Sequence, residues 1–400
     1  MTLWMLFVAL AVVAFAAAEA GCRWWIRRRS RYYVWPPGLR LELRQHPDVF
    51  PEVEPHVRID INTDGERGGE VRGDEDGLYR VLVVGGSAAE CYALDQPTSW
   101  PGAVERLLNA PDSLRALGAR RAHVGNIGRS GIGSADLDLV LERVLPQYRR
   151  LDAILIMVAA SDVYHWLEDG APDRPPSTVP EDVLFSAHPQ QPFGWKPGAL
   201  AMTEVVRRLR RLYLRPLDVK EDFGSWVPGA RKMRAAAKEL RSTLPDSRPM
   251  LDHFEHHFSR LVRRAMVHAD RVLVVRQPWF EKDYTEEEAA RFWHGGVGKP
   301  WKETISVYYS LDVLNTLMGQ VDARAVQVAD ALGVPHVNLR PVLDQGLRHY
   351  YDHDHYTPVG AAVVARTVAT ALWPPRRQPA PARGSDGGAP SPFFTATSVT

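Results

Sequence analysis

Val81-Leu82-Val83-Val84-Gly85-Gly86-Ser87 is the stretch of sequence that decides the fold. Four consecutive apolar residues, with no polar residue between them, are typical of a strand that is buried on both faces. Such strands belong to parallel sheets, which helices cover on both sides. Functional groups collect outside the carboxyl ends of strands in these sheets. Ser87, which follows the strand directly, is therefore a candidate functional residue.

Strands and helices alternate along the chain from this point to residue 372. The predicted strands are 80–84, 121–124, 153–158, 271–276 and 334–338, and the predicted helices are 100–109, 135–148, 311–332 and 359–372. Alternation of this kind predicts a parallel sheet with helices on both faces. The expected fold is therefore α/β, a three-layer α/β/α sandwich around a five-stranded parallel sheet.

Four other segments complete the predicted domain organisation. Residues 1–29 form an apolar helix with a basic flank, and residues 30–79 are an irregular stalk or lead-in with a short strand near 56–61. Residues 170–268 are an insertion into the 80–372 domain, proline-rich at first and helical from 201 onward. The tail 373–400 is rich in Pro, Arg, Gly and Ser, a composition that predicts disorder.

The N-terminal segment predicts a membrane anchor. The run from Leu3 to Ala18 carries no charge, and Trp24-Trp25 follow it at the place where interfacial aromatic residues are expected. A cleaved signal peptide normally has positive charge before its apolar run, and here there is none. The arginines follow the run, so the positive-inside rule favours a cytoplasmic main domain, and an extracytoplasmic one stays open. A buried or interfacial helix is the alternative reading of this segment.

Composition excludes several classes of function. The 400 residues carry a net charge of +1, which gives no reason to expect nucleic acid as a partner. The two cysteines, Cys22 and Cys91, are too few for a disulfide framework and lack metal-ligand spacing. His253 and His257 lie one helical turn apart, but no third ligand is evident, so we expect a polar helix face and no metal. No cofactor is expected either.

The residues after the predicted strands form the set that acyl transfer requires. A serine hydroxyl becomes a nucleophile when a histidine takes its proton and a carboxylate orients that histidine. Ser87 follows the first strand, and Asp352 and His355 follow the fifth at a spacing that one turn can close. Backbone N–H groups of Ser87 and Gly128, with the hydroxyl of Ser161 after the third strand, could bind the oxyanion.

These segments resemble the SGNH (GDSL-type) hydrolase superfamily in sequence and in order. The matches are Gly85-Gly86-Ser87, Asn126-Ile127-Gly128, Ala159-Ala160-Ser161-Asp162, and Asp352-x-x-His355 with Thr357-Pro358-x-Gly360 after it. The segment 86–95, followed by Trp100-Pro101, is similar to a bacterial membrane-anchored branch. The resemblance implies a flavodoxin-like sheet, a Ser87–His355–Asp352 triad, and hydrolysis or transfer of an O-acyl group on a glycan or lipid. It also implies a structural role for Asp162 near the site.

One departure from the family pattern bears on activity. The third segment usually reads Gly-x-Asn-Asp, and Ser161 stands where the asparagine amide would donate to the oxyanion. A hydroxyl can also donate, although its reach is shorter. The alternative function is therefore a non-catalytic, membrane-tethered scaffold that retains the fold.

Two further alternatives concern the assignment of the triad and the role of a group of aromatic residues. Pairing of Asp354 with His355, or of Asp352 with His353, would change the assignment of the triad. A cluster of aromatic residues is expected either to line an acyl or sugar pocket or to pack in the core, and it consists of Trp279, Phe280, Phe292, Trp293 and Trp301.

Overall fold

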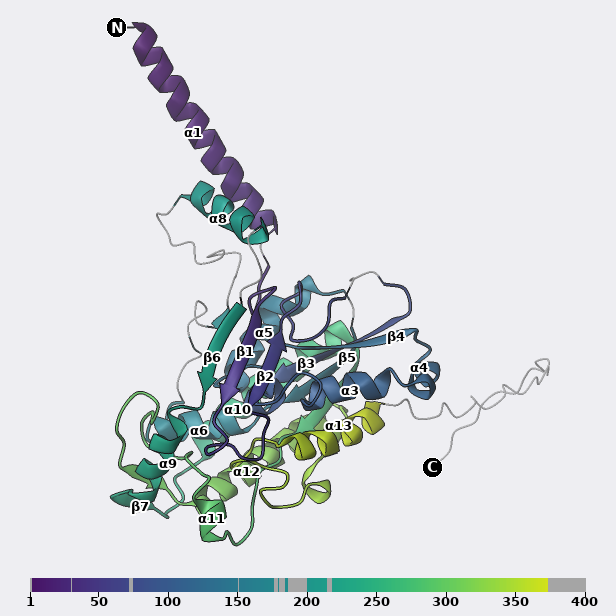
Figure 1. Cartoon of the computed structure of the whole chain (residues 1–400), viewed down its shortest axis with the longest axis vertical. Coiled ribbons are helices and arrows are strands. Elements are labelled where there is room, and N and C mark those ends of the chain that lie inside the picture. The colour runs from purple at the N-terminus through teal and green to yellow at the C-terminus, as the bar shows by residue number, and fades with distance from the viewer. Residues whose placement is uncertain are drawn as a thin grey trace, which may run out of the picture.

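The structure is a computed structural model of the whole chain (Figure 1). It describes residues 2–29, 31–71, 75–149, 151–175, 179, 184–185, 200–213 and 218–372, without the side chains of residues 2, 27–29, 207–208 and 211–213. The predicted disorder of the tail 373–400 falls outside the described residues. The same holds for most of the proline-rich start of the predicted insertion.

A five-stranded, fully parallel sheet forms the centre of the molecule. Its strands are β3 (Leu78–Gly85), β4 (Arg121–Asn126), β5 (Leu151–Met157), β8 (Ala269–Arg276) and β10 (His336–Asn338), arranged in the order β10-β8-β5-β3-β4. Counted along the sheet's own strands this is 2-1-3-4-5, the flavodoxin-like order. The predicted α/β fold with a five-stranded parallel sheet is confirmed.

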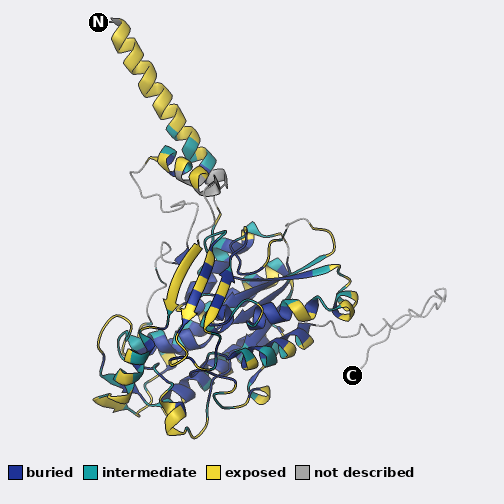
Figure 2. Cartoon of the chain, viewed as in Figure 1, coloured by how far each residue is buried: buried dark blue, intermediate teal, exposed yellow. Residues whose placement is uncertain are grey.

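Helices cover both faces of this sheet. One face packs against α3 (Trp100–Leu108) and α13 (Pro358–Leu372), and the other packs against α5 (Ser134–Val144), α10 (Arg248–His268) and α12 (Leu311–Ala331). Successive residues of β3 are buried on opposite faces, with Val81 and Val83 toward α3 and Leu82 toward α5. Figure 2 shows the buried strands between these helix layers. The three-layer sandwich therefore follows from the apolar run that opened the sequence.

The predicted lead-in is only partly right in its secondary structure, because the strand expected near 56–61 is present and a strand before it was not expected. Residues 40–60 form β1 (Arg40–Gln45) and β2 (His56–Asp60), which pair antiparallel and share a small sheet with β6 (Asp218–Phe223). Leucine, valine and isoleucine side chains of β1 and β2 make a separate apolar cluster beneath this sheet. The lead-in therefore folds onto the domain.

The predicted helical insertion is also only partly right. Between α8 (Ala201–Tyr213) and α10 the chain forms β6, α9 (Val227–Ala235) and β7 (Glu239–Arg241), and β7 pairs with β9 (Val307–Tyr309). The charged, exposed sequence of β6 lacks the alternation that marks a strand. The remaining elements are α2 (Ser87–Glu90), α4 (Pro111–Leu117), η1 (Leu145–Gln147), α6 (Ala160–Glu168), α11 (Glu286–Ala289) and η3 (Arg340–Val342).

The N-terminal helix α1 (Thr2–Arg29) extends away from the domain (Figure 1). Its span Leu3–Ile26 is apolar and long enough to cross a membrane, and a membrane anchor and a signal sequence both meet this description. The carboxylate of Glu19, the charge that interrupts the apolar run, accepts hydrogen bonds from the backbone N–H groups of Ala201 (2.8 Å) and Met202 (3.1 Å). Glu19 thus holds the first turn of α8 against α1, because N–H groups in a first turn lack partners in their own helix.

Candidate active site

The turn that carries Ser87 begins where β3 ends. Gly85 passes so close to β5 that a Cβ atom on it would lie 2.1 Å from the carbonyl oxygen of Met157. Only glycine fits at this position, and Gly86 then leads directly into α2, whose first residue is Ser87. The N–H of a first helical residue has no acceptor within its helix. Ser87 is therefore placed at the carboxyl edge of the sheet with its backbone N–H available.

Ser87, His355 and Asp352 form a continuous hydrogen-bonded chain. His355 Nε2 lies 2.7 Å from Ser87 Oγ, and His355 Nδ1 lies 2.8 Å from Asp352 Oδ2. Asp352 Oδ1 also accepts from the backbone N–H groups of Asp354 and His355, which holds the carboxylate in place. Since Nδ1 faces a carboxylate, it carries the hydrogen, and Nε2 is left to accept the serine proton.

The alternative pairings are less well placed. Asp354 Oδ1 lies 3.6 Å from His355 Nδ1, and Asp354 instead accepts from Gln277 Nε2 at 2.9 Å. His353 points into the core, where its Nδ1 lies 2.6 Å from the Tyr164 hydroxyl and its Nε2 lies 3.0 Å from Asn315 Oδ1. The geometry therefore brings Asp352 and His355 together and keeps His353 apart from the serine.

The charges around His355 favour its protonated form. Burial lowers the pKa of His355, but the carboxylates of Asp352 and Asp354 outweigh burial and raise the pKa to about 9. Burial raises the pKa of Asp352, yet the facing imidazolium holds it well below its usual range. Burial raises the pKa of Asp354 to about 6. The site thus stabilises an imidazolium, the species that forms when a serine gives up its proton.

These charges predict an alkaline pH profile. If His355 acts as general base it must be neutral, so kcat/KM is expected to rise with pH up to about 9, the pKa of His355. The variant Asp354→Asn removes one of the two carboxylates that raise this pKa, so its ascending limb should lie at lower pH. Asp173→Asn, at an exposed site, should leave the limb in place. The pH at which kcat/KM rises is measured from profiles between pH 5 and 10. If it is the same in Asp354→Asn as in the wild type, the carboxylate of Asp354 does not raise the pKa of His355.

The structure places the three predicted oxyanion donors differently. Ser161 and Ser87 line the same cavity, and among the described residues the Ser161 hydroxyl has no hydrogen-bond partner. The N–H of Gly128 donates to Asn126 Oδ1 at 2.8 Å, so it is not free for an oxyanion. The prediction for Gly128 is therefore corrected. Gly131, three residues later, lines the cavity, and its left-handed backbone (φ +72°) suits glycine.

Two buried carboxyl groups hold the loop that contains Gly131. Asp162 accepts from the Ser134 N–H and from the Ser134 hydroxyl at 2.6 Å, which fixes the start of α5 against α6. On the other side of the loop, the Ser130 hydroxyl donates to Glu90. Burial raises the pKa of Glu90 to about 7 and that of Asp162 to about 6. These contacts give Asp162 a supporting position next to the site.

A cavity of about 540 Å³ opens in front of Ser87. Much of its wall is aromatic, and the aromatic residues include Phe50, Tyr92, Phe223, Trp226, Trp293 and Trp301. Trp279, Phe280 and Phe292, by contrast, are buried in the core, so the predicted aromatic cluster divides between the two roles. Phe50 from the lead-in and Phe223 and Trp226 from the insertion could not be predicted as cavity residues, because their position depends on the pairing of β1 with β6.

A second, much smaller cavity is also lined by Ser87. Its volume is about 10 Å³, and its wall consists of Ser87, Ala88, Cys91, Ala93, Leu94, Tyr351, His355 and Tyr356. About one water-sized probe fills such a volume. Ser87 therefore borders both a very small cavity and a large aromatic one.

Among the described residues, His294, Asp354 and His355 could bring metal-ligand atoms together, within 4.8 Å of one another. His355 Nδ1 already contacts Asp352 in this arrangement. Burial holds the pKa of His294 well below its usual range, so His294 is neutral. His253 and His257 contact each other on α10, and His257 Nδ1 lies 3.2 Å from Asp138.

Comparisons with known proteins give only distant matches. No protein-family model and no curated protein matches the sequence. Similar solved structures include an acetylxylan esterase from Geobacillus stearothermophilus, with 15% identity over 73% of this chain and 93% of that one and a TM-score of 0.38. An alpha/beta hydrolase enzyme from the metagenome of Lake Arreo, Spain, has 15% identity over 74% and 97% and the same TM-score. A likeness of this degree carries no argument about function, which rests on the site's own geometry.

Proposed function

We propose that this chain is a serine esterase of SGNH type that hydrolyses a short O-acyl ester, or transfers its acyl group, on a glycan or lipid. The observation that carries the proposal is the hydrogen-bonded chain from Ser87 through His355 to Asp352, with distances of 2.7 and 2.8 Å. This is the geometry that a nucleophile, its base and its orienting group need. No cofactor takes part.

The steps follow from these positions. Ser87 Oγ attacks the ester carbonyl carbon while His355 Nε2 takes the hydroxyl proton, and the carbonyl oxygen becomes an oxyanion. The N–H groups of Ser87 and Gly131 and the Ser161 hydroxyl are the donors that we assign to it. His355 then protonates the leaving alcohol as the C–O bond breaks, which leaves the acyl group on Ser87. Water, or an acceptor hydroxyl, attacks the acyl-enzyme through the same base and restores the serine.

The two cavities support a division of the substrate into a small acyl group and a larger alcohol. The 10 Å³ space beside Ser87 suits an acetyl methyl group, and the aromatic cavity suits the face of a sugar ring or an apolar chain. Glu168 favours the sugar. Glu168 lines the aromatic cavity, and burial raises its pKa to about 8, so it is a neutral acid at pH 7. Such a group can exchange hydrogen bonds with sugar hydroxyls.

Hydrolysis of p-nitrophenyl acetate by the full-length protein, together with labelling by a fluorophosphonate, tests the proposal. We expect turnover and one covalent adduct on the Ser87 peptide. The rival function, a scaffold that keeps the fold without catalysis, is favoured by the missing asparagine at Ser161. If the protein shows no hydrolysis and forms no adduct, the scaffold function is established and the enzyme is rejected.

Ser161 should contribute through its hydroxyl. Ser161→Ala removes one proposed oxyanion donor and is expected to lower kcat about 10²-fold, with little change in KM. Ser161→Thr retains a hydroxyl and should keep more activity than alanine. Steady-state kinetics on p-nitrophenyl acetate measure both variants. An alanine variant as active as the wild type would remove Ser161 from the oxyanion site.

Cys91 should limit the length of the acyl group. It lines the small cavity in a left-handed backbone conformation (φ +53°), which glycine adopts at lower cost. Cys91→Gly enlarges the cavity and relieves this strain, so the ratio of butyrate to acetate hydrolysis should rise about 10-fold, the lower end of the ~1–3 kcal/mol that a methylene contributes in an apolar pocket. Ala171→Gly relieves the same strain at φ +57° away from the site and should leave the ratio unchanged. An equal ratio in all three proteins would contradict the acyl-pocket assignment.

We also propose that α1 anchors the enzyme in a membrane. The span Leu3–Ile26 has 24 residues, and none of its most apolar 18-residue window is buried by the rest of the chain. Its length of roughly 36 Å exceeds the ~30 Å of a hydrocarbon core. Arg27, Arg28, Arg29 and Arg31 follow this span and favour a cytoplasmic site by the positive-inside rule. Sedimentation of the full chain with membranes after an alkaline carbonate wash tests the anchor.

A further inference from the structure

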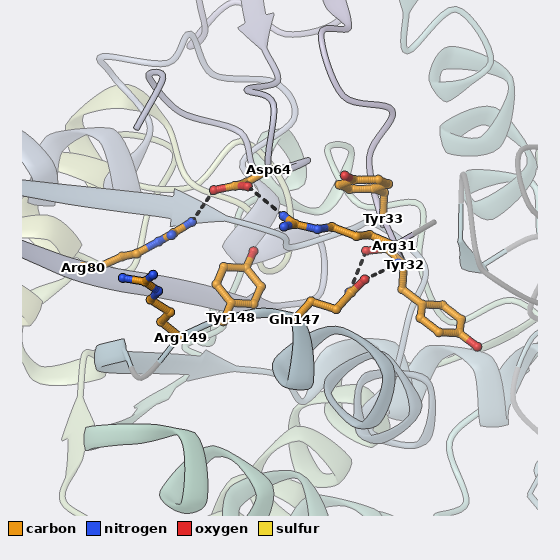
Figure 3. A pocket seen from close by; sticks show the side chains of 8 residues that line it. All are labelled: Arg31, Tyr32, Tyr33, Asp64, Arg80, Gln147, Tyr148 and Arg149. Carbon is orange, nitrogen blue, oxygen red and sulfur yellow. Dashed lines mark hydrogen bonds and ion pairs between the residues drawn. The ribbon is translucent and has the colours of Figure 1, made fainter. Parts of the chain in front are cut away.

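A third cavity, of about 270 Å³, lies at the opposite edge of the sheet from Ser87. Its wall comes from the amino ends of strands: Arg80 lies near the start of β3, and Tyr148 and Arg149 lie just before β5. Arg31, two residues beyond the end of α1, and Asp64 complete it. Figure 3 shows these side chains around the cavity, which we call the amino-edge pocket.

The pocket carries an excess of positive charge. Three guanidinium groups, those of Arg31, Arg80 and Arg149, face one carboxylate, that of Asp64. Asp64 is already shared, because it accepts from Arg80 at 2.8 Å and from Arg31 at 3.5 Å. Arg149 is exposed and has no ion pair or hydrogen bond with any described residue. The charge of Arg149 therefore lacks a counterion within the described chain.

The carboxylate behind the pocket does not cancel this excess. Glu66 is buried and contacts Arg80 Nη2 at 3.0 Å, but it also contacts His123 Nε2 at 2.9 Å. Burial lowers the pKa of His123, yet Glu105 and Glu66 outweigh burial and raise it to about 9, so His123 is charged, and Glu105 Oε2 lies 3.4 Å from its Nδ1. Asp64, Glu66 and Glu105 therefore balance three of the four cations, and an excess of one positive charge remains. Arg80 Nε, enclosed in the pocket wall, has no acceptor among the described residues.

The pocket is held in shape by contacts on both sides. Gln147 Oε1 accepts from the backbone N–H of Tyr32 at 2.6 Å, and Gln147 Nε2 donates to the Tyr32 carbonyl at 3.0 Å. The guanidinium of Arg80 lies over the Tyr148 ring, 5.0 Å from its centre. The segment that follows α1 is therefore fastened to the domain, and Arg80 is held in the pocket wall.

We propose that the amino-edge pocket binds a phosphate group. Guanidinium groups pair with phosphate through two parallel hydrogen bonds, and three of them approaching from different segments suit an anion with three or four oxygens better than a two-oxygen carboxylate. The volume is below the ~300–1,000 Å³ of sites for drug-sized ligands, which fits a headgroup or a small phosphate ester. A phospholipid at the end of α1 and a soluble phosphate are the two sources of this chemistry.

Calorimetric titration of the full-length protein in a non-ionic detergent tests the site. The probes are inorganic phosphate, dihexanoyl phosphatidic acid below its micellar concentration, and acetate. We expect Arg149→Gln to weaken phosphate-group binding roughly 10- to 100-fold, because charge-assisted hydrogen bonds are lost. Arg263→Gln removes an exposed arginine from α10 and should bind as the wild type does. Hydrolysis of p-nitrophenyl acetate should be the same in all three proteins.

The titrations distinguish a phospholipid headgroup from a soluble phosphate as the ligand of the amino-edge pocket. Arg149-dependent binding of phosphatidic acid alone assigns the pocket to a lipid headgroup, and binding of inorganic phosphate as well assigns it to the phosphate group from either source. Binding of acetate as tightly as phosphate overturns the proposal, and so does binding that is equal in Arg149→Gln and the wild type. None of these results depends on the esterase, since the binding is measured without turnover.

Discussion

Replacing Ser87 by alanine is expected to lower ester hydrolysis about 10⁶-fold and to abolish fluorophosphonate labelling. The reason is the 2.7 Å contact between Ser87 Oγ and His355 Nε2, which makes this hydroxyl the activated nucleophile. When such a nucleophile is removed, its base no longer has a proton to accept, so little of the triad's contribution remains. Initial rates with p-nitrophenyl acetate and intact-mass analysis of the labelled protein measure the two effects.

The control for this experiment is another serine of the same cavity. Ser130 lines the cavity, but its hydroxyl donates to Glu90 and contacts no histidine in the part of the chain that the structure describes. Ser130→Ala should therefore still be labelled. The double variant Ser87→Ala/His355→Ala should be no slower than Ser87→Ala, because the two residues act as a unit. Labelling that persists in Ser87→Ala would place the nucleophile elsewhere.

Replacing Asp352 by asparagine is expected to lower kcat about 10⁴-fold while leaving KM nearly unchanged. The Asp352 carboxylate fixes the tautomer of His355 through the 2.8 Å contact with Nδ1 and stabilises the imidazolium. An amide is neutral and can present its N–H₂ group to the ring, which would turn the hydrogen of His355 toward Ser87. Because the carboxylate also raises the pKa of His355, the remaining activity should rise at lower pH than in the wild type.

Asp354→Asn is the matched control, since it alters a buried carboxylate two residues away that lies 3.6 Å from the same ring nitrogen. At its own optimum pH it should retain most of the wild-type kcat. Equal losses in the two variants would mean that Asp352 is not the only orienting group, and a larger loss in Asp354→Asn would reverse the assignment.

The central sheet could be predicted because its information is local. The strands β3, β5 and β8 each contain a short apolar run, so residues 81–84 alone indicate a two-sided environment. The positions of Ser87, Asp352 and His355 follow, because parallel strands bring their carboxyl ends to one edge. The distances among these three residues required the structure.

The errors have physical causes that lie outside any local window. β6 is charged and exposed, and it becomes a strand by pairing with β1, a distant part of the chain. Gly128 and Gly131 are two glycines of one turn, and their roles differ because the Asn126 side chain accepts from the first of them. Neither the pairing nor the side-chain contact leaves a periodic signal in the sequence. The aromatic wall of the cavity also depends on strand pairing between β1 and β6 and on side-chain contacts between distant segments, such as that of Phe50 with Phe223.

The bond between Glu19 and the start of α8 has a consequence for how the chain matures. A leader that export machinery cuts away can make no lasting contact with the folded protein, whereas Glu19 supplies acceptors for two backbone N–H groups of α8. Cleavage after α1 would leave those groups without their partner. We therefore expect the mature protein to keep its first residues, and N-terminal sequencing of the membrane-bound form should begin ahead of Glu19.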